Sequence, residues 1–294
     1  MQEPRSPSES AGDRERLERC LAAVAPFLAD EAAGFYGPGS LAWLVYREPP
    51  VLLAGLAAVL LQVAHPAVAA GVWSRSAFRA DLVGRTLRTG AALHRLTFGP
   101  ASAAVDLSRR LHAVHARVRG HSDDAGAYRA NDPELLYWVW ATLVDTPPRL
   151  WQALYRPLRT DERERFYAEA RRSAVLLGVP DALLPPDPAA FARDYTRRLA
   201  DLRVSDDGRA IAAALLASPL CRLVPGARTI TTALLPPALR AQFGLRFGAR
   251  DERRYQLALR ALRLLIRTIP APLRAVPAYQ RARVRVAVSR LLRR

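Results

Sequence analysis

The chain has 294 residues, and 44 basic residues against 27 acidic ones give it a formal net charge of +17. Every basic residue is arginine, which excludes a lysine Schiff base, a Walker-type phosphate-binding lysine and a Ser-Lys nucleophile. The two cysteines, Cys20 and Cys221, are too few for a disulfide framework or a cysteine-based metal site. Because half of the residues are apolar, the chain can bury a sizeable core.

The N-terminal segment is polar and mixed in charge, with neither an apolar core nor a small-residue cleavage site. It therefore does not resemble an export signal, and we expect a cytoplasmic protein whose membrane association is left open. Residues 1–15 are predicted to form a disordered tail, residues 16–280 a single globular helical domain, and residues 281–294 an arginine-rich C-terminal helix or tail.

An uncharged stretch covers residues 51–72 and is long enough to cross a bilayer. Its second half contains Gln62, His65 and Pro66, whose polar groups and freed backbone carbonyl would need partners in lipid. A buried central helix that ends near His65 and Pro66 explains the same pattern. We favour the buried helix over a membrane span.

Apolar residues recur at helical spacing through most of the remaining chain. Asp132 is suited to be an N-cap with Pro133 at the first helical position, and Pro147–Pro148 are predicted to end that helix. The Pro-rich residues 179–188 are the best candidate for a joint between two halves. The predicted helices span residues 17–28, 84–96, 101–118, 133–145, 161–177, 188–202, 207–216 and the region from 236 onward. With no alternating run long enough for a sheet, the fold class is all-α.

Positive charge is concentrated at the C-terminal end, where residues 240–294 contain 15 arginines and two acids, a net charge of +13. Such a surface suits the phosphates of nucleic acid or of anionic lipid. The simpler explanation is a solvated helical face with a frayed end in an arginine-rich sequence. Since no zinc finger or similar motif is present, we expect no nucleic-acid partner, and peripheral membrane contact is the favoured functional interpretation.

Histidine is rare, and two of the five histidines, His112 and His115, lie one helical turn apart. His115 continues the row formed by Leu107 and Leu111 toward the predicted core. A neutral imidazole inside a helical bundle can ligate haem iron, although an inward histidine is more often a hydrogen-bonded core residue. No paired Glu-x-x-His pattern accompanies it, which argues against a di-iron carboxylate site.

Arg85 and Thr89 are four residues apart and so lie on one face of a helix. Both side chains donate hydrogen bonds and could hold an anion, a haem propionate or an oxygen intermediate. The structural alternative is an arginine paired with an internal carboxylate and a threonine bonded to its own helix. Spacing alone favours that alternative.

Several segments, in order, resemble the rubber oxygenase catalytic domain family, which includes latex clearing protein and the endoplasmic-reticulum-bound oxygenase of mycophenolic acid biosynthesis. Together they cover roughly residues 35–280. The similar segments are residues 62–72, 78–81, 85–89, 114–120, 128–135, 141–145, 167–180 and 239–245.

The resemblance implies a globin-like helical core that holds one b-type haem without covalent attachment. By motif, His115 matches the axial iron ligand, and Arg85 and Thr89 match the pair near the distal face, where they would act in catalysis. Arg85 and His65, which lies in the first similar segment, are counted with His115 among the cofactor-binding residues. The implied function is a haem-dependent oxygenase that uses dioxygen on an apolar or aromatic small molecule. The alternative is a non-catalytic haem- or lipid-binding protein at a membrane surface.

Two positions depart from the family pattern. Latex clearing protein has a lysine before the motif threonine that can ligate the distal iron position, whereas Arg88 stays protonated and is not expected to coordinate. Many members have a histidine where this chain has Trp140. Cleavage of polyisoprene is therefore not expected of this chain.

Overall fold

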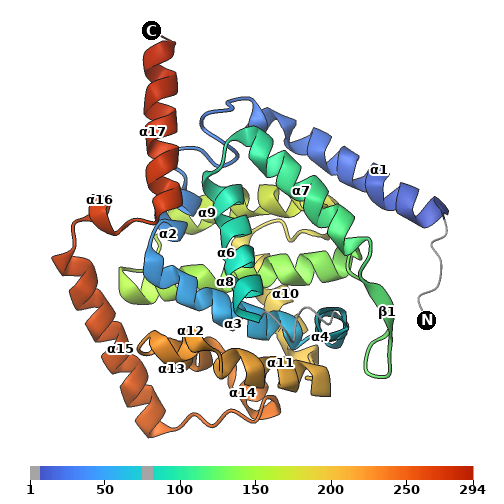
Figure 1. The fold of residues 1–294 in the computed structure, drawn as a ribbon, viewed down its shortest axis with the longest axis vertical. Helices are drawn as coiled ribbons and strands as arrows, with labels where there is room; N and C mark the ends of the chain where they lie inside the picture. Colours follow the sequence, from blue (N-terminus) through green and yellow to red (C-terminus); the bar gives the residue numbers. More distant parts are fainter. Residues whose placement is uncertain (1–6, 75–81, 294) are drawn as a thin grey trace.

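Helices form nearly all of the regular structure in residues 7–74 and 82–293, which are the residues that the computed structural model describes (Figure 1). One short antiparallel hairpin accompanies them. The all-α prediction is confirmed.

The helices follow one another along the whole chain with short connections. Single-turn 3-10 helices at Ala25–Leu28, Pro49–Val51 and Asp181–Leu183 join some of them. The α-helices are α1 (Pro7–Val24), α2 (Leu41–Tyr46), α3 (Leu52–Val63), α4 (Pro66–Trp73), α6 (Leu82–Phe98), α7 (Ala101–His115), α8 (Pro133–Leu154), α9 (Thr160–Leu176), α10 (Pro188–Asp201), α11 (Asp206–Leu216), α12 (Pro219–Leu223), α13 (Ala227–Leu234), α14 (Pro237–Gln242), α15 (Ala249–Thr268), α16 (Ala271–Arg274) and α17 (Pro277–Leu292).

Helix α3 is the buried central helix that the sequence favours. It runs beside α8 through the middle of the molecule, and α13 covers another side of it (Figure 1). Its residues Ala54, Ala57, Leu60 and Leu61 are fully buried. Among the described residues, no single helix is long and apolar enough to cross a bilayer. Pro49–Val63 and α4 meet that test only when they are taken together, and the two segments are bent by 104° relative to each other.

Helix α8 begins as predicted but does not end as predicted. The carboxylate of Asp132 accepts a hydrogen bond from the Glu134 N–H at 2.8 Å, and Pro133 takes the first helical position. The prediction that Pro147–Pro148 end the helix is wrong, because α8 continues to Leu154. Proline removes the N–H that would bond to the Leu143 carbonyl, and the Tyr46 hydroxyl donates to that oxygen instead, at 2.9 Å.

Helix α7 ends at His115, earlier than the predicted end near Gly120. The chain then forms a hairpin of β1 (Arg119–Ser122) and β2 (Gly126–Arg129), in which Gly120 pairs with Tyr128. A Cβ atom on Gly120 would lie 2.8 Å from the Tyr128 hydroxyl oxygen. Gly120 therefore lets the buried Tyr128 ring cross the hairpin and reach α4, rather than ending a helix.

The N-terminal helix begins before the predicted limit of the disordered tail. We expected a tail through residue 15, whereas α1 starts at Pro7 and buries Leu17 and Leu21 in the main core. Asp13 pairs with Arg16 at 2.9 Å, and Arg16 also donates to the Asn131 carbonyl at 2.7 Å. The long-range bond of Arg16, next to the predicted tail, thus connects α1 to the residues before α8.

The Pro-rich residues 179–188 do not divide the molecule. Val179 and Leu184 are buried in a core that takes side chains from both sides of this segment, from Leu17 to Phe243. The described chain therefore shares one main core across the predicted joint.

A buried carboxylate connects the last third of the chain to this core. Glu48, only 2% exposed, accepts hydrogen bonds from Arg274 Nε at 2.8 Å, the Tyr155 hydroxyl at 2.6 Å and Arg47 Nε at 3.1 Å. Burial acts to raise the pKa of Glu48, but the bonds from Arg274 and Tyr155 outweigh it and lower that pKa. Glu48 is thus ionised and joins α16 to α8.

We predict that Glu48→Ala lowers the free energy of unfolding by about 3–5 kcal/mol, because it leaves the Arg274 charge without its partner. Asp106→Ala, which breaks an exposed ion pair with Arg110, should cost less than about 1 kcal/mol. Because the Glu48 pKa is lowered on folding, its contribution should persist above the ordinary carboxyl pKa of about 4.3 and shrink at lower pH. Urea unfolding between pH 3 and 8 measures this, and equal costs for the two variants would contradict it.

Candidate functional site

The candidate site residues lie on three neighbouring helices, α4, α6 and α7. Gly99 and Pro100 join α6 to α7, and the two helices pack against each other. A Cβ atom on Gly99 would lie 2.2 Å from the Arg95 carbonyl oxygen, so only glycine allows this tight turn. The turn sets α6 and α7 side by side (Figure 1).

His115 is the last residue of α7 and is half-buried. Helical spacing puts it on the same face as Ala104 and Ser108, both buried, so it lies on the inward side as predicted. Its carbonyl accepts from the Val118 N–H at 2.8 Å, and a Cβ atom on Gly71 would lie 3.2 Å from Val118 Cγ1. His115 therefore lies three residues before Val118, the point after α7 where the chain approaches α4.

His112, one turn earlier, has different surroundings. It is 8% exposed, and neither ring nitrogen has a hydrogen-bond partner of ordinary geometry. Burial lowers the pKa of His112, and the charges of Arg16 and Arg14 on α1 act in the same direction against Asp13. Because α1 covers this ring, a ligand could reach His112 only if α1 moved. His115 is the more accessible of the two imidazoles.

The pair on α6 is only partly described. Arg85 lies in α6, but its side chain is outside the described residues. Thr89, one turn later, is exposed, as is Arg88 beside it. Leu93 continues the face of α6 that carries Arg85 and Thr89, as the four-residue spacing requires.

A small apolar cavity of about 30 Å³ lies where this face of α6 meets α2, α8 and α9. Its volume leaves room for little more than one water molecule, so it cannot hold a substrate as it stands. Its walls include Tyr46, Leu93, Leu96, Trp140, Phe166 and Ala170.

Trp140, which replaces the histidine found in many family members, is one wall of the cavity. It is 2% exposed, and its Nε1–H donates to the Ala170 carbonyl at 2.9 Å. Its ring meets Phe191 edge-on with the centroids 5.7 Å apart. Trp140 thus binds α8, α9 and α10 together, a structural role that the sequence did not reveal.

His65 is the N-cap of α4, a role that its sequence context did not indicate. Its Nδ1 accepts a hydrogen bond from the Ala67 N–H at 3.2 Å. Burial and the Arg198 guanidinium lower the pKa of His65, so the ring favours its neutral form. With Nδ1 occupied as an acceptor, the neutral ring carries its proton on Nε2 and keeps that N–H for another contact.

The donor set fits a haem better than a metal held by side chains alone. Within residues 7–74 and 82–293, no three His, Cys, Asp or Glu side chains gather as a metal site would require. A bound haem would need only one histidine from the protein to hold its iron. His115 can supply that ligand, and Leu107 and Leu111, half-buried on the same side of α7, suit the apolar macrocycle.

The described residues form a predominantly α-helical protein. Residues 43–268 match the family model described as ER-bound oxygenase mpaB/B'/Rubber oxygenase, catalytic domain, and the chain belongs to that family. The resemblance stated from the sequence is thereby confirmed.

Two mycobacterial relatives are similar over most of the chain. They are Uncharacterized protein Mb2261 of Mycobacterium bovis and Uncharacterized protein Rv2237 of Mycobacterium tuberculosis. Each is 31% identical over 230 residues, which cover 74% of this chain and 90% of the relative. No solved structure matches the chain.

We predict that Trp140→His, which restores the residue of many family members, lowers the free energy of unfolding by about 3 kcal/mol. The smaller ring enlarges the cavity and loses the contact with Phe191. Trp140→Phe keeps most of the packing and should cost about 1–2 kcal/mol, mainly for the smaller buried ring, since the Ala170 carbonyl still accepts from the Ser173 hydroxyl at 2.7 Å. Urea unfolding compares the variants, and a histidine variant as stable as the parent would contradict the structural role of Trp140.

Proposed function

We propose that the protein is a haem b-dependent oxygenase that acts on an apolar or aromatic small molecule. The observation that carries the proposal is the inward, half-buried position of His115 at the end of α7, in a chain that belongs to an oxygenase family. Haem b, when bound, would supply the redox chemistry that activates dioxygen.

His115 would hold the cofactor. It is half-buried at the end of α7, three residues before Val118, which lies against Gly71 of α4. Among the other described histidines, His65 caps α4, His94 contacts the Phe98 ring, and His112 is buried. His115 is the histidine whose position best suits a ligand role.

Arg85 and Thr89 would stabilise negative charge on the oxygen substrate by donating hydrogen bonds from α6. Their spacing places both on one face of that helix, which continues into the wall of the apolar cavity at Leu93. Because Thr89 is exposed, a bound haem and substrate would have to exclude water from this face before its donors act strongly on developing charge. Arg88, exposed and permanently charged, would not coordinate iron.

The side chains around the cavity favour an apolar substrate. No charged side chain is among the described residues that line the cavity. Its Tyr46 hydroxyl and Trp140 N–H already donate to backbone carbonyls. An apolar or aromatic molecule beside the haem would meet mainly aliphatic and aromatic surface.

The ligand assignment is tested by single substitutions. We predict that His115→Gly abolishes stoichiometric haem binding, that added imidazole restores it, and that His94→Ala, His112→Ala and His121→Ala keep it. The Soret absorbance per protein chain is the measurement, with circular dichroism as the control for folding. Loss of haem in His112→Ala with retention in His115→Gly would move the ligand by one turn.

The role of the α6 pair is tested by oxygen chemistry rather than by haem content. Arg85→Ala and Thr89→Val should bind haem normally but change the rate at which the reduced protein consumes dioxygen by about a hundredfold or more. Arg88→Ala, the exposed neighbour, is the matched control and should behave as the parent. A large loss of thermal stability in Arg85→Ala with normal oxygen consumption would instead assign Arg85 to a buried ion pair.

A further inference from the structure

Helix α15 has one face without a partner in the described structure. Its inner face packs Leu259, Leu262 and Ile266 against α13 and α8. In Figure 1 it forms the outer edge of the molecule, with no helix drawn beyond it. The orientation of α15 is therefore fixed by its buried side, and its opposite side faces outward.

That outward face is apolar along its centre. Leu257 and Leu264 are each 65% exposed and Leu265 is 51% exposed. Spacings of seven and eight residues put the two later leucines within the same outward arc as Leu257. In α16, which follows, Leu273 is 78% exposed. Neighbouring large apolar side chains left in water usually mark a contact surface.

Arginines flank the exposed leucines. Helix α15 contains six arginines and two acids, a net charge of +4, and both acids lie in its first turn. Arg253, Arg260 and Arg267 are exposed, and no carboxylate among the described residues forms an ion pair with them. Arg263 is also exposed, but it donates to the Ala153 carbonyl at 2.6 Å.

Helix α17 likewise combines arginines with exposed apolar side chains. Its inner residues Ala282 and Val286 pack in a cluster with Trp43 and Phe98, while Val284 and Val288 are exposed. Arg285 donates to the backbone carbonyls of Ala32 and Phe98, which fixes α17 to the body of the protein. Helix α17 thus packs against the protein on one side, while its Arg283 and Arg290 are exposed.

We propose that the outer face of α15 is a docking surface for an anionic membrane, with its leucines in the lipid interface and its arginines on the phosphates. Charge decides between the occupants, because a second copy of this chain would bring two positive faces together. Nucleic acid would neutralise the arginines but leave the leucines in water. An anionic lipid surface accommodates both groups. The proposal does not depend on the haem or on the oxygenase activity.

The test is binding of the full-length protein to vesicles, measured by co-sedimentation at low and at high salt. Binding is expected to phosphatidylcholine vesicles that contain phosphatidylserine, to fall with salt, and to be weak without phosphatidylserine. Arg253→Gln with Arg260→Gln should lower the partition coefficient by about 30-fold, since each arginine contributes about fivefold. Leu257→Gln with Leu264→Gln should lower it by at least about tenfold.

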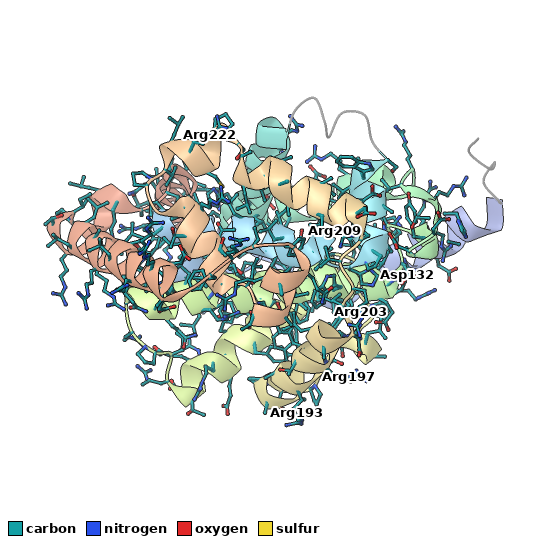
Figure 2. All side chains as sticks on the ribbon, turned by 90° about the horizontal axis from the view of Figure 1, so that it is seen from below. Asp132, Arg193, Arg197, Arg203, Arg209 and Arg222 are labelled. Carbon is teal, nitrogen blue, oxygen red and sulfur yellow. The ribbon has the colours of Figure 1, made fainter. Side chains whose placement is uncertain are left out.

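Matched controls lie elsewhere on the surface. Arg193→Gln with Arg197→Gln removes the same charge from α10, where Figure 2 shows both side chains. Val114→Gln removes an apolar side chain of α7 that is 51% exposed. Both controls should bind vesicles within about twofold of the parent. Thermal melts confirm that each variant is folded.

Several results would overturn the proposal. One is absence of binding to phosphatidylserine vesicles at low salt. Another is a loss of vesicle binding in the α10 control equal to that in the α15 arginine pair. A third is unchanged vesicle binding in the leucine pair, which would mean that charge alone attracts the protein. Tight binding of a labelled DNA or RNA duplex that the α15 arginine pair abolishes, with no vesicle binding, would assign the face to nucleic acid. A dimer in light scattering that the leucine pair dissociates would assign it to a second copy.

Discussion

The fold depends on the burial of one uncharged segment, residues 51–72. Exposing the apolar side chains of a helix such as α3 to water costs free energy. Helices α8 and α13 therefore cover α3 and form the core with it. The segment does not continue straight, because His65 begins a new helix, α4. The two helices are bent by 104° relative to each other. The bend brings Gly71 of α4 against Val118, three residues beyond His115. Packing of the core thereby determines where the end of α7 and its histidine lie.

Two polar side chains within this core have defined partners. Glu48 accepts hydrogen bonds from three donors and connects the C-terminal third of the chain to α8. The single N–H of Trp140 donates to a backbone carbonyl of α9. The substitution of tryptophan for the histidine of many family members therefore exchanges a titratable group for packing area. It leaves His115 as the described histidine that best combines an inward position with access.

Local signals in the sequence predicted local structure, and distant contacts decided the rest. Asp132 and Pro133 act on their own helix, so the start of α8 could be predicted from the sequence, as could the shared face of Arg85 and Thr89. The passage of α8 through Pro147 depends on the Tyr46 hydroxyl, about a hundred residues away, and no spacing rule contains that information. The same holds for the cover that α1 places over His112, which separates two histidines that are equivalent by periodicity.

The central claim is that the chain holds one b-type haem through a single histidine, and the wild-type protein tests it directly. Apoprotein titrated with haemin, with haem b quantified after acid–acetone extraction, gives the stoichiometry and the mode of attachment together. We predict a Soret band that saturates at one haem per chain. We also predict complete extraction of the haem, as expected without covalent attachment. A titration that leaves haemin unbound, in protein that is folded by circular dichroism, would contradict it.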